Sequence, residues 1–421
     1  MEALQKFSSR LLRIAPGVEE ILETERRFPG EPVLALACAY LWLYAQTPEG
    51  QTQAGEYLRR AEARSNELGG REAEWLRALK LWHDRDFDAA ATAFENITGR
   101  WPRDLLAVKA AEFLYYILGQ QASGPRFLAH LERLAEFHPG DPDFLAMHAF
   151  AHELCGHAGE AREKAEHALS IEPCVPWAQH ALEHVLLWEG SPDEGVDRLE
   201  SWLSTWDRAG RVIHCHNAWH VAIMHLDRLN EHRAFAVFDT HVWGLSPDMV
   251  VEQLDAIAFL WRAEMAGWEV PVERFRAIAD HVRPFAETLF MPFVSAHYAY
   301  ALARSGDTDA VEKLLACVDA KAAAPDREAR RVWAPVGREI IHGTVALARG
   351  DAAGAAARLD PVMPRMTIIG GSDAQDDLFR FAYLDSLKRS GRRADAREFL
   401  SRRLEQKRPS ALEEKLLAEV A

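Results

Sequence analysis

The sequence has little cysteine and no long apolar run, and both absences narrow the class of protein. Its five cysteines are scattered and include no CxxC pair, as is common in proteins of a reducing compartment. The longest apolar stretch, residues 33–45, is 13 residues long, which is too short to span a bilayer. The segment MEALQKFSSRLLRIAPG lacks the continuous apolar core of a signal peptide. We therefore expect a reduced, soluble, cytoplasmic protein with no membrane partner.

The chain also lacks an excess of basic residues. It has 49 Lys and Arg against 64 Asp and Glu, a formal net charge of −15. Nucleic acids and anionic membrane surfaces are bound by clustered basic side chains, so neither is an expected partner. Hydrophobic residues make up 48% and charged residues 27% of the 421 residues, a balance typical of globular proteins. The length fits two to three average domains or one continuous repeat array.

Strand-type alternation of apolar residues is nearly absent, whereas helical periodicity runs through most of the chain. Short turns break it at RDFDAA (85–90), CGHAGEA (155–161), EGSPDEG (189–195), SGDTDAV (305–311), RGDAAGA (349–355) and SGRRADA (390–396). Longer joints with proline alternate with these turns at RWPRD (100–104), FHPGDPD (137–143) and IEPCVPW (171–177). Their prolines Pro102, Pro139 and Pro173 are 37 and 34 residues apart, close to the period of a tetratricopeptide repeat.

This pattern predicts an all-α fold, an α-α superhelix built as a tetratricopeptide-like solenoid. About ten to eleven helix pairs are expected between Pro32 and Arg408. We expect a single domain over residues 1–421, with more regular repeats over about 70–190 and irregular repeats over about 191–421. The small residues expected where two helices pack closely are Ala149, Ala161 and Ala168.

The first helix of each pair in such a repeat lines the concave surface of the array. Alignment of the repeats on their mid-turn residues predicts this surface to contain Lys109, Phe113, Tyr116, Glu153, Trp177, His180, His184, Asn217, His220, Met224, Trp261, Glu264, Phe293 and Tyr300. A mixture of aromatic, imidazole and carboxylate groups is typical of small-molecule pockets.

Histidine is the most informative residue type. The chain has 18 histidines, and six of them form HxxxH pairs on successive first helices: His148/His152, His180/His184 and His216/His220. An i,i+4 spacing puts both rings of a pair on one helix face. The repeat register predicts that His180, His184 and His220 share one hollow, whereas His148 and His152 point into packing.

Three interpretations of the shared histidines are open. In the first, they are core or surface residues of a histidine-rich solenoid. In the second, they hold a metal, and HALEH at 180–184 matches the HxxEH pattern of inverted zinc peptidases. In the third, they bind a polar ligand or act as acid and base without metal, because imidazole titrates near neutral pH and carboxylates can orient it.

Two further segments bear on the pocket. His297 and Tyr300, from the segment FVSAHYAYALARSGD, are placed to complete it from later in the chain. The segment RMTIIGGSDAQDDLF (365–379) ends an apolar run and starts a helix, with Ser372 or Asp373 as its N-cap. It contains no lysine and is not a phosphate loop. Motifs of serine hydrolases, cysteine enzymes and dinucleotide-binding proteins are missing from the sequence, and no cofactor is predicted.

Five segments resemble the tetratricopeptide repeat protein 38 family: WAQHALEHV (177–185), CHNAWH (215–220), FDTHV (238–242), GGSDAQDDLF (370–379) and KRPSALEEKL (407–416). The resemblance runs in order from about residue 140 onward, and CHNAWH and GGSDAQ are its most specific parts. It implies an all-helical repeat fold in a soluble intracellular protein and implies no reaction. It also points to His216, Asn217 and the Gly370–Gln375 loop.

We predict a closed or tightly curved solenoid whose concave pocket binds a small polar molecule, or binds it and acts on it by acid–base chemistry. The catalytic candidates are His220 and His180, and no metal ligand is assigned. The ligand-binding candidates are His184, His216, Asn217, Trp177, Trp261, Glu264, His297 and Tyr300. The alternatives are a scaffold that binds a partner peptide in its groove and a metal-dependent hydrolase. Enzymatic activity and oligomeric state are left open.

Overall fold

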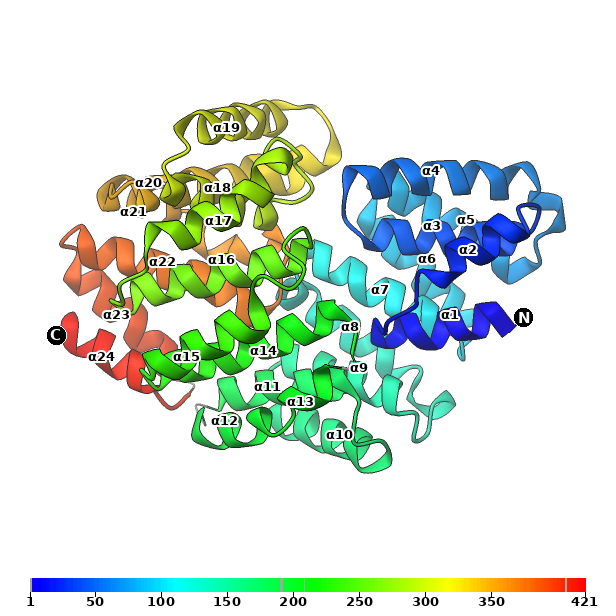
Figure 1. Ribbon diagram of the computed structural model, residues 1–421, viewed down its shortest axis with the longest axis horizontal. Coiled ribbons are helices and arrows are strands. Elements are labelled where there is room, and N and C mark those ends of the chain that lie inside the picture. Colours follow the sequence, from blue (N-terminus) through cyan, green and yellow to red (C-terminus); the bar gives the residue numbers. More distant parts are fainter. Residues whose placement is uncertain (1, 190–191, 208, 406) are drawn as a thin grey trace. The chain divides into compact units, whose positions relative to one another are not determined.

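The computed structural model describes residues 2–189, 192–207, 209–405 and 407–421, and helices dominate it (Figure 1). No β-strand occurs within these ranges. The predicted all-α, tetratricopeptide-like helical-repeat fold is confirmed. Between Pro32 and Leu404 the described helices follow one another in ten pairs, with one additional short helix, in agreement with the predicted number.

Two compact units divide the chain. Unit 1 comprises Met1–Ala181 and Asp207–Gly210, and unit 2 comprises Leu182–Trp206 and Arg211–Ala421. Helix α11 (Pro176–Trp188) contributes residues to both. The single array over residues 1–421 stays a prediction, and each unit is described by itself below.

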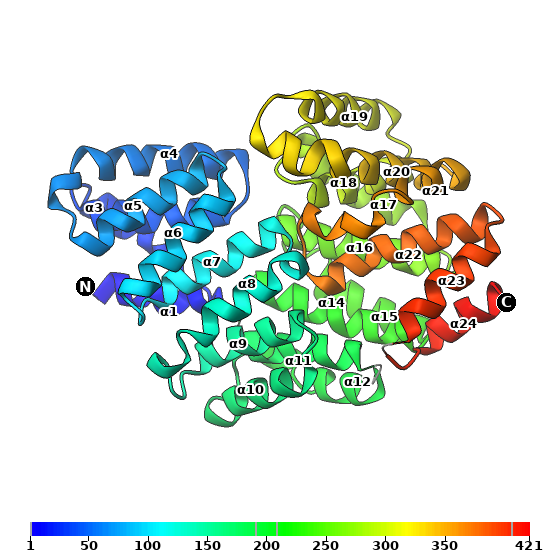
Figure 2. The same ribbon diagram turned by 180° about the vertical axis from the view of Figure 1, so that it is seen from behind.

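The helices of unit 1 before α11 are α1 (Glu2–Arg13), α2 (Glu20–Arg27), α3 (Pro32–Tyr44), α4 (Pro48–Ala63), α5 (Gly70–His83), α6 (Phe87–Arg100), α7 (Leu105–Leu118), α8 (Gln120–Glu132), α9 (Pro142–Leu154) and α10 (Ala158–Ile171). Short 3-10 turns η1 (Ser65–Glu67) and η2 (Ala135–Phe137) join some of them. Neighbours in the chain pack as neighbours in space from α3 to α10 (Figure 2).

The helices of unit 2 after α11 are α12 (Pro192–Glu200), α13 (Leu203–Trp206), α14 (Arg211–Asp227), α15 (Glu231–Val237), α16 (Val250–Met265), α17 (Val272–Val282), α18 (Pro292–Ser305), α19 (Thr308–Ala323), α20 (Arg338–Ala348), α21 (Ala352–Leu359), α22 (Asp373–Arg389), α23 (Arg393–Leu404) and α24 (Ala411–Glu419). Shorter helical segments are η3 (Phe238–Val242), η4 (Arg283–Phe285), η5 (Ala329–Gly337) and η6 (Met363–Ile369).

The predicted turns lie where the helices end. Each described turn and proline joint falls between two helices, and residues 190–191 of the turn at 189–195 lie outside the described ranges. Polar side chains in turns between two helices accept a hydrogen bond from the backbone N–H three residues later and so cap the next helix. They include Asp86, Asn230, Asp307 and Asp351. The three small residues predicted at a helix–helix contact, Ala149, Ala161 and Ala168, are fully buried on α9 and α10, which pack together.

Arg13 joins the first helix of unit 1 to two carboxylates later in the chain. Arg13, at the end of α1, donates from Nε to Oδ1 of Asp143 at 2.8 Å and from Nη1 to Oε1 of Glu172 at 2.6 Å. Its Nη2 reaches the second oxygen of each carboxylate. Two bidentate pairs fix the guanidinium more firmly than a single exposed ion pair does.

Replacing Arg13 with alanine is expected to lower the stability of unit 1 by about 1–2 kcal/mol, because two carboxylates lose a partly buried partner. Thermal and urea unfolding of the variant measure the change. The control is Arg59→Ala, at an exposed position of α4, which should change stability by less than about 0.5 kcal/mol. Equal effects of the two substitutions would contradict the role given to Arg13.

In unit 2, the first helices of successive helix pairs form a series that returns to its start. Helices α14, α16, α18, α20 and α22 each pack against the next, and α22 also packs against α16. Helix α24 packs against α14. Both ribbon views show α22 beside α16 (Figures 1 and 2). This return brings residues 373–413 against α14 and α16.

A membrane-spanning segment is not found in the described part of the chain, where every helix is too short or too polar to cross a bilayer.

Candidate functional site

Three buried histidines of unit 2 form a row between two carboxylates. His216 donates from Nδ1 to the carboxylate of Asp255 at 3.0 Å. The ring centres of His216 and His220 are 5.0 Å apart, and those of His220 and His184 are 4.7 Å apart. At the other end, Nδ1 of His184 is 2.8 Å from Oδ1 of Asp373. The row therefore joins α16, α14, α11 and α22.

The local sequence sets each end of this row. His216 and His220 are one turn apart on α14, so both rings leave the same helix face. Asp373 is the first residue of α22, which Ser372 caps with a hydrogen bond from the N–H of Gln375. Gly371 precedes the cap with φ +96°, and a Cβ there would lie 2.8 Å from the ring of Phe293, so only glycine fits this turn. Of the two predicted N-cap residues, Ser372 and Asp373, the structure has Ser372 as the cap.

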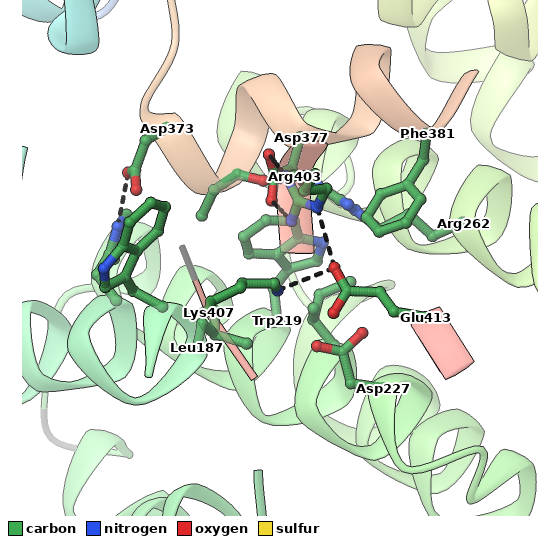
Figure 3. A pocket seen from close by; sticks show the side chains of 14 residues that line it. Leu187, Trp219, Asp227, Arg262, Asp373, Asp377, Phe381, Arg403, Lys407 and Glu413 are labelled. Atoms are coloured by element: carbon green, nitrogen blue, oxygen red, sulfur yellow. Dashed lines mark hydrogen bonds and ion pairs between the residues drawn. The ribbon is translucent and has the colours of Figure 1, made fainter. Parts of the chain in front are cut away.

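A small cavity of about 50 Å³ lies at the His184–Asp373 end of the row. Its lining residues are His184, Leu187, Trp188, Trp219, Ile223, Asp227, Arg262, Asp373, Ala374, Asp377, Phe381, Arg403, Lys407 and Glu413, all in unit 2. Figure 3 shows Asp373 on one side and the linked group of Arg403, Asp377 and Glu413 on the other. The volume has room for a few water molecules, and so for the polar end of a small molecule.

One wall of the cavity is a partly buried ion network, in which the side chains of Arg403 and Asp377 are 18% and 24% exposed. Arg403 makes two hydrogen bonds to Asp377, at 2.6 and 2.8 Å, and a third to Glu413 at 2.9 Å. Lys407 also contacts Glu413, at 2.9 Å. Burial alone would raise the pKa of Asp377, but Arg403 and Arg380 hold it well below its ordinary value. These charges are matched to one another, so they shape the wall.

Arg262 and Asp227 are the cavity groups with capacity for a ligand. Arg262 donates from Nη2 to the carbonyl of Ala374 at 2.6 Å, and its guanidinium lies 5.6 Å from the ring centre of Trp219. Its Nε has no hydrogen-bond partner among the described residues. Burial lowers the pKa of Arg262 to about 10 and raises the pKa of Asp227 to about 6. Perturbed titratable groups that face a cavity are common at functional sites.

Replacing Asp227 with asparagine is expected to stabilise the protein at pH 8 and to have little effect at pH 4. The unfolded carboxyl releases its proton near pH 3.8 and the folded one near pH 6. Wild type therefore loses stability as pH rises between these two values. The total loss, reached above pH 6, is on the order of 1–3 kcal/mol. Urea unfolding at pH 4, 6 and 8 measures this difference.

The matched control is Asp197→Asn, at an exposed position of α12, which should show no such pH dependence. A stability difference between wild type and Asp227→Asn that does not grow between pH 4 and pH 8 would contradict the assignment.

The sequence-predicted residues of α11 and α14 occupy different places in unit 2. His184 lines the cavity, whereas His220, His216 and Asn217 are not among its lining residues. His184 and His220 are 1% and 0% exposed, and Asn217 is also fully buried. His216 stacks on Trp219 with ring centres 5.4 Å apart, and Trp219 itself lines the cavity.

Four other predicted ligand-binding residues pack together outside the lining of this cavity. Trp261 stacks on Tyr300 with ring centres 3.9 Å apart, and the Tyr300 hydroxyl donates to Glu264 at 2.5 Å. His297 donates from Nδ1 to the carbonyl of Phe293 at 2.8 Å, and burial lowers its pKa to about 4. The Trp261–Tyr300 stacking and the Tyr300–Glu264 hydrogen bond join α16 to α18, and the role of these four residues in ligand binding stays a prediction.

Trp177 and His180 lie in unit 1. Their ring centres are 5.5 Å apart, and His180 also packs against Phe150 at 5.2 Å. The ammonium of Lys109 is 3.8 Å from the ring centre of Trp177. The predicted meeting of His180 with His184 and His220 involves both units and stays a prediction.

Sequence reasoning missed most of the charged cavity wall. Arg262 carried a signal, because it stands alone in the otherwise apolar stretch AFLWRA at 258–263, and a lone charge on a buried face needs a partner. Glu413 carried another, because Ser410 and Glu413 have the spacing of a capping box, which the structure contains. The pairing of Arg403 with Asp377 had no local signal, since 26 residues separate them.

No family model matches the chain. Among solved structures, a human IFIT1 dimer with m7Gppp-AAAA is 16% identical, with 93% of this chain and 90% of that chain covered and a TM-score of 0.44. A Naa15/Naa10 complex bound to HypK-THB is 12% identical, with 99% and 66% covered and a TM-score of 0.27. Yeast Tom70 is 12% identical, with 83% and 88% covered and a TM-score of 0.24. At these TM-scores the similarities carry no argument about ligands or partners.

Proposed function

We propose that unit 2 binds a small polar molecule in the cavity beside His184 and acts on it by acid–base chemistry. The observation that carries this proposal is the hydrogen bond between His184 and Asp373, both of which line the cavity. A carboxylate on Nδ1 orients an imidazole and stabilises its protonated form, as a general acid or base requires.

The row behind His184 supports the same role. Each end of the row is a hydrogen bond between an imidazole and a carboxylate, His216 with Asp255 and His184 with Asp373, and hydrogen bonds in a buried network strengthen one another. The sequence assigns the acid–base roles to His220 and His180. The cavity favours His184 as the group nearest a ligand, with His220 as its neighbour in the row.

Arg262 and Asp227 define the class of ligand. The unused donor of Arg262 suits a carboxylate or another oxyanion, and Asp227 suits a hydroxyl or amino group. Trp219 and Phe381 supply apolar walls. The proposed ligand is therefore a small acid that also carries a hydrogen-bond donor. The surplus of negative charge over the whole chain does not prevent this, because the site is local.

We also propose that the chain is a member of the tetratricopeptide repeat protein 38 family. Four of the five segments that carry the resemblance contribute residues to this region of unit 2. They supply His184, then His216 and His220, then Asp373 and Asp377, and finally Lys407 and Glu413. These segments are far apart in the sequence but contribute to one site, which gives a physical reason why all of them resemble the same family.

The experiment is a thermal-shift screen of small hydroxy and amino acids and related anions against the full chain. We expect at least one compound to raise the melting temperature, because a ligand that binds only the native state stabilises it. Failure of every compound to shift the wild-type chain would contradict the proposal.

A second candidate, a protein–protein interaction scaffold, is favoured by a larger hollow in unit 1. This hollow has a volume of about 440 Å³ and is lined by apolar residues, among them Phe7, Leu36, Tyr40 and Trp75, and by the charged residues Arg71, Glu72, Arg103 and Asp104. Extended peptides dock in such hollows through their side chains. A scaffold would keep its partner after loss of His184, whereas the small-molecule function would not survive.

The metal-dependent hydrolase has less support. Its general base would be Glu183, which is fully buried and does not line the cavity. Burial also raises the pKa of Glu183 well above its ordinary value.

A further inference from the structure

Two histidines of α9 and one glutamate of α8 converge in unit 1. The carboxylate oxygen Oε1 of Glu132 lies 3.1 Å from Nε2 of His148 and 3.3 Å from Nε2 of His152. All three ligand atoms lie within 4.8 Å of one another. The sequence predicts packing for both histidines, and they are indeed buried, at 3% and 7% exposure, but both rings turn the same nitrogen to one carboxylate.

The repeat fold produces this arrangement. His148 and His152 are one turn apart on α9, with ring centres 4.8 Å apart and planes at 33°. Glu132 is the last residue of α8, and α8 packs against α9. The three groups therefore come from two helices that the fold itself holds together.

The distances fit a tetrahedral metal centre. Zinc binds imidazole nitrogen and carboxylate oxygen at about 2.0–2.2 Å, and two ligands at a tetrahedral angle around such an ion are about 3.3–3.5 Å apart. The two oxygen–nitrogen separations, 3.1 and 3.3 Å, are close to this range. Two histidines and a carboxylate are also a ligand set that zinc and neighbouring transition metals use.

An ordinary ion pair explains only part of the cluster. His148 makes a hydrogen bond to Glu132, but Nε2 of His152 has no hydrogen-bond partner among the described residues, although it faces the same oxygen. On the other side of that ring, Nδ1 of His152 is 3.4 Å from Nδ1 of His157. A partner on Nδ1 sets the ring so that Nε2 can offer its lone pair, as in many metal sites.

We propose that Glu132, His148 and His152 bind one divalent transition-metal ion of the zinc class, with a remaining position open to water. The side chain of Glu132 is 53% exposed, which gives the ion a route from solvent. The ion ties the end of α8 to the middle of α9 and so stabilises the junction of two consecutive helix pairs. This site is separate from the cavity of unit 2 and does not depend on the function proposed there.

The test uses the full chain, purified without a histidine tag and freed of metal with a chelator. Zn²⁺ binding is measured by calorimetry, and Co²⁺ serves as a probe because its visible absorption reports tetrahedral coordination. We expect one ion per chain, a rise in melting temperature with Zn²⁺, and affinity reduced about tenfold or more in Glu132→Gln. This substitution is at an exposed side chain and should leave the fold intact.

Two control variants test whether the metal binds at this site. His167→Gln changes an exposed histidine of α10 and should bind the ion as wild type does. His184→Gln should do the same, because His184 belongs to unit 2. The proposal is overturned if the chain binds no Zn²⁺, if Glu132→Gln binds it with wild-type affinity, or if His184→Gln abolishes binding.

Discussion

Replacing Arg403 with methionine is expected to lower the free energy of unfolding by about 3 kcal/mol, the lower end of the range for breaking a buried ion pair on one side, because Arg403 and Asp377 are partly buried. The substitution leaves Asp377 and Glu413 close together without the guanidinium that bonds both. Asp227, in the same cavity, adds a further carboxyl. At neutral pH the variant is therefore expected to unfold at a lower temperature and a lower urea concentration than wild type.

The electrostatics give the reason for so large an effect. Burial alone would raise the pKa of Glu413, but Arg403 and Lys407 lower it below its ordinary value. A carboxylate with a lowered folded-state pKa stabilises the native state above its unfolded pKa. Loss of Arg403 removes this contribution from both carboxylates and leaves their desolvation cost in place.

Urea and thermal unfolding at pH 7 measure the change in Arg403→Met. The control is the neighbouring Arg402→Met, whose side chain is 73% exposed and pairs only with Glu398 within the described residues, and which should change stability by less than about 0.5 kcal/mol. Addition of Asp377→Asn to Arg403→Met should recover part of the loss, because it removes one unpaired charge. Similar stability of Arg403→Met and wild type would show that the ion network does not stabilise this part of the fold.

Replacing His184 with glutamine is expected to weaken binding of a compound found in the screen by about 10- to 100-fold, the effect of losing one charge-assisted hydrogen bond. If the compound is also turned over, the rate should fall by about 10²–10⁴-fold, as for loss of a general acid or base. Glutamine keeps a polar side chain of similar length, so the helical content should be unchanged.

Calorimetric titration of that compound compares wild type, His184→Gln and a matched control. The control is His232→Gln, an exposed histidine of α15 in the same unit, which should bind as wild type does. Asp373→Asn should show an intermediate loss, because the imidazole remains but its orienting carboxylate is gone. Unchanged binding in His184→Gln would exclude this imidazole from the site.

Helix positions could be predicted from the sequence because their causes are local. The apolar period of 3.6 residues, the capping aspartates of the short turns and the prolines of the longer joints each act within a few residues. Asp86 and Asp351 cap the helices that the turn pattern predicts. The division into two units has no comparable local signal, since no linker or composition change marks residues 181–182.

The candidate site could be predicted only where helical spacing or the repeat register reaches. The spacing of His216 and His220 sets their common face, and the register brings His184 near them. The carboxylates at the ends of the row were beyond this reasoning, because 39 residues separate His216 from Asp255 and 189 separate His184 from Asp373. Such contacts depend on how strongly the series of helices curves. The packing of α22 against α16 sets this curvature.

The stacked rings of Trp261 on α16 and Tyr300 on α18 show what register reasoning leaves open. Trp261 and Tyr300 were expected at a ligand, yet they stack on each other and do not line the described cavity. Helical spacing gives the face of a side chain, whereas the neighbouring helix decides whether that face meets a cavity or another ring.

The most direct measurement is a crystal structure of the full chain with a compound from the thermal-shift screen. We expect density for that compound in unit 2, with an acidic group on Arg262 and a polar group within hydrogen-bond distance of His184. Density in the apolar hollow of unit 1 instead, or imidazoles of His184 and His220 that lie far apart, would contradict the proposed site.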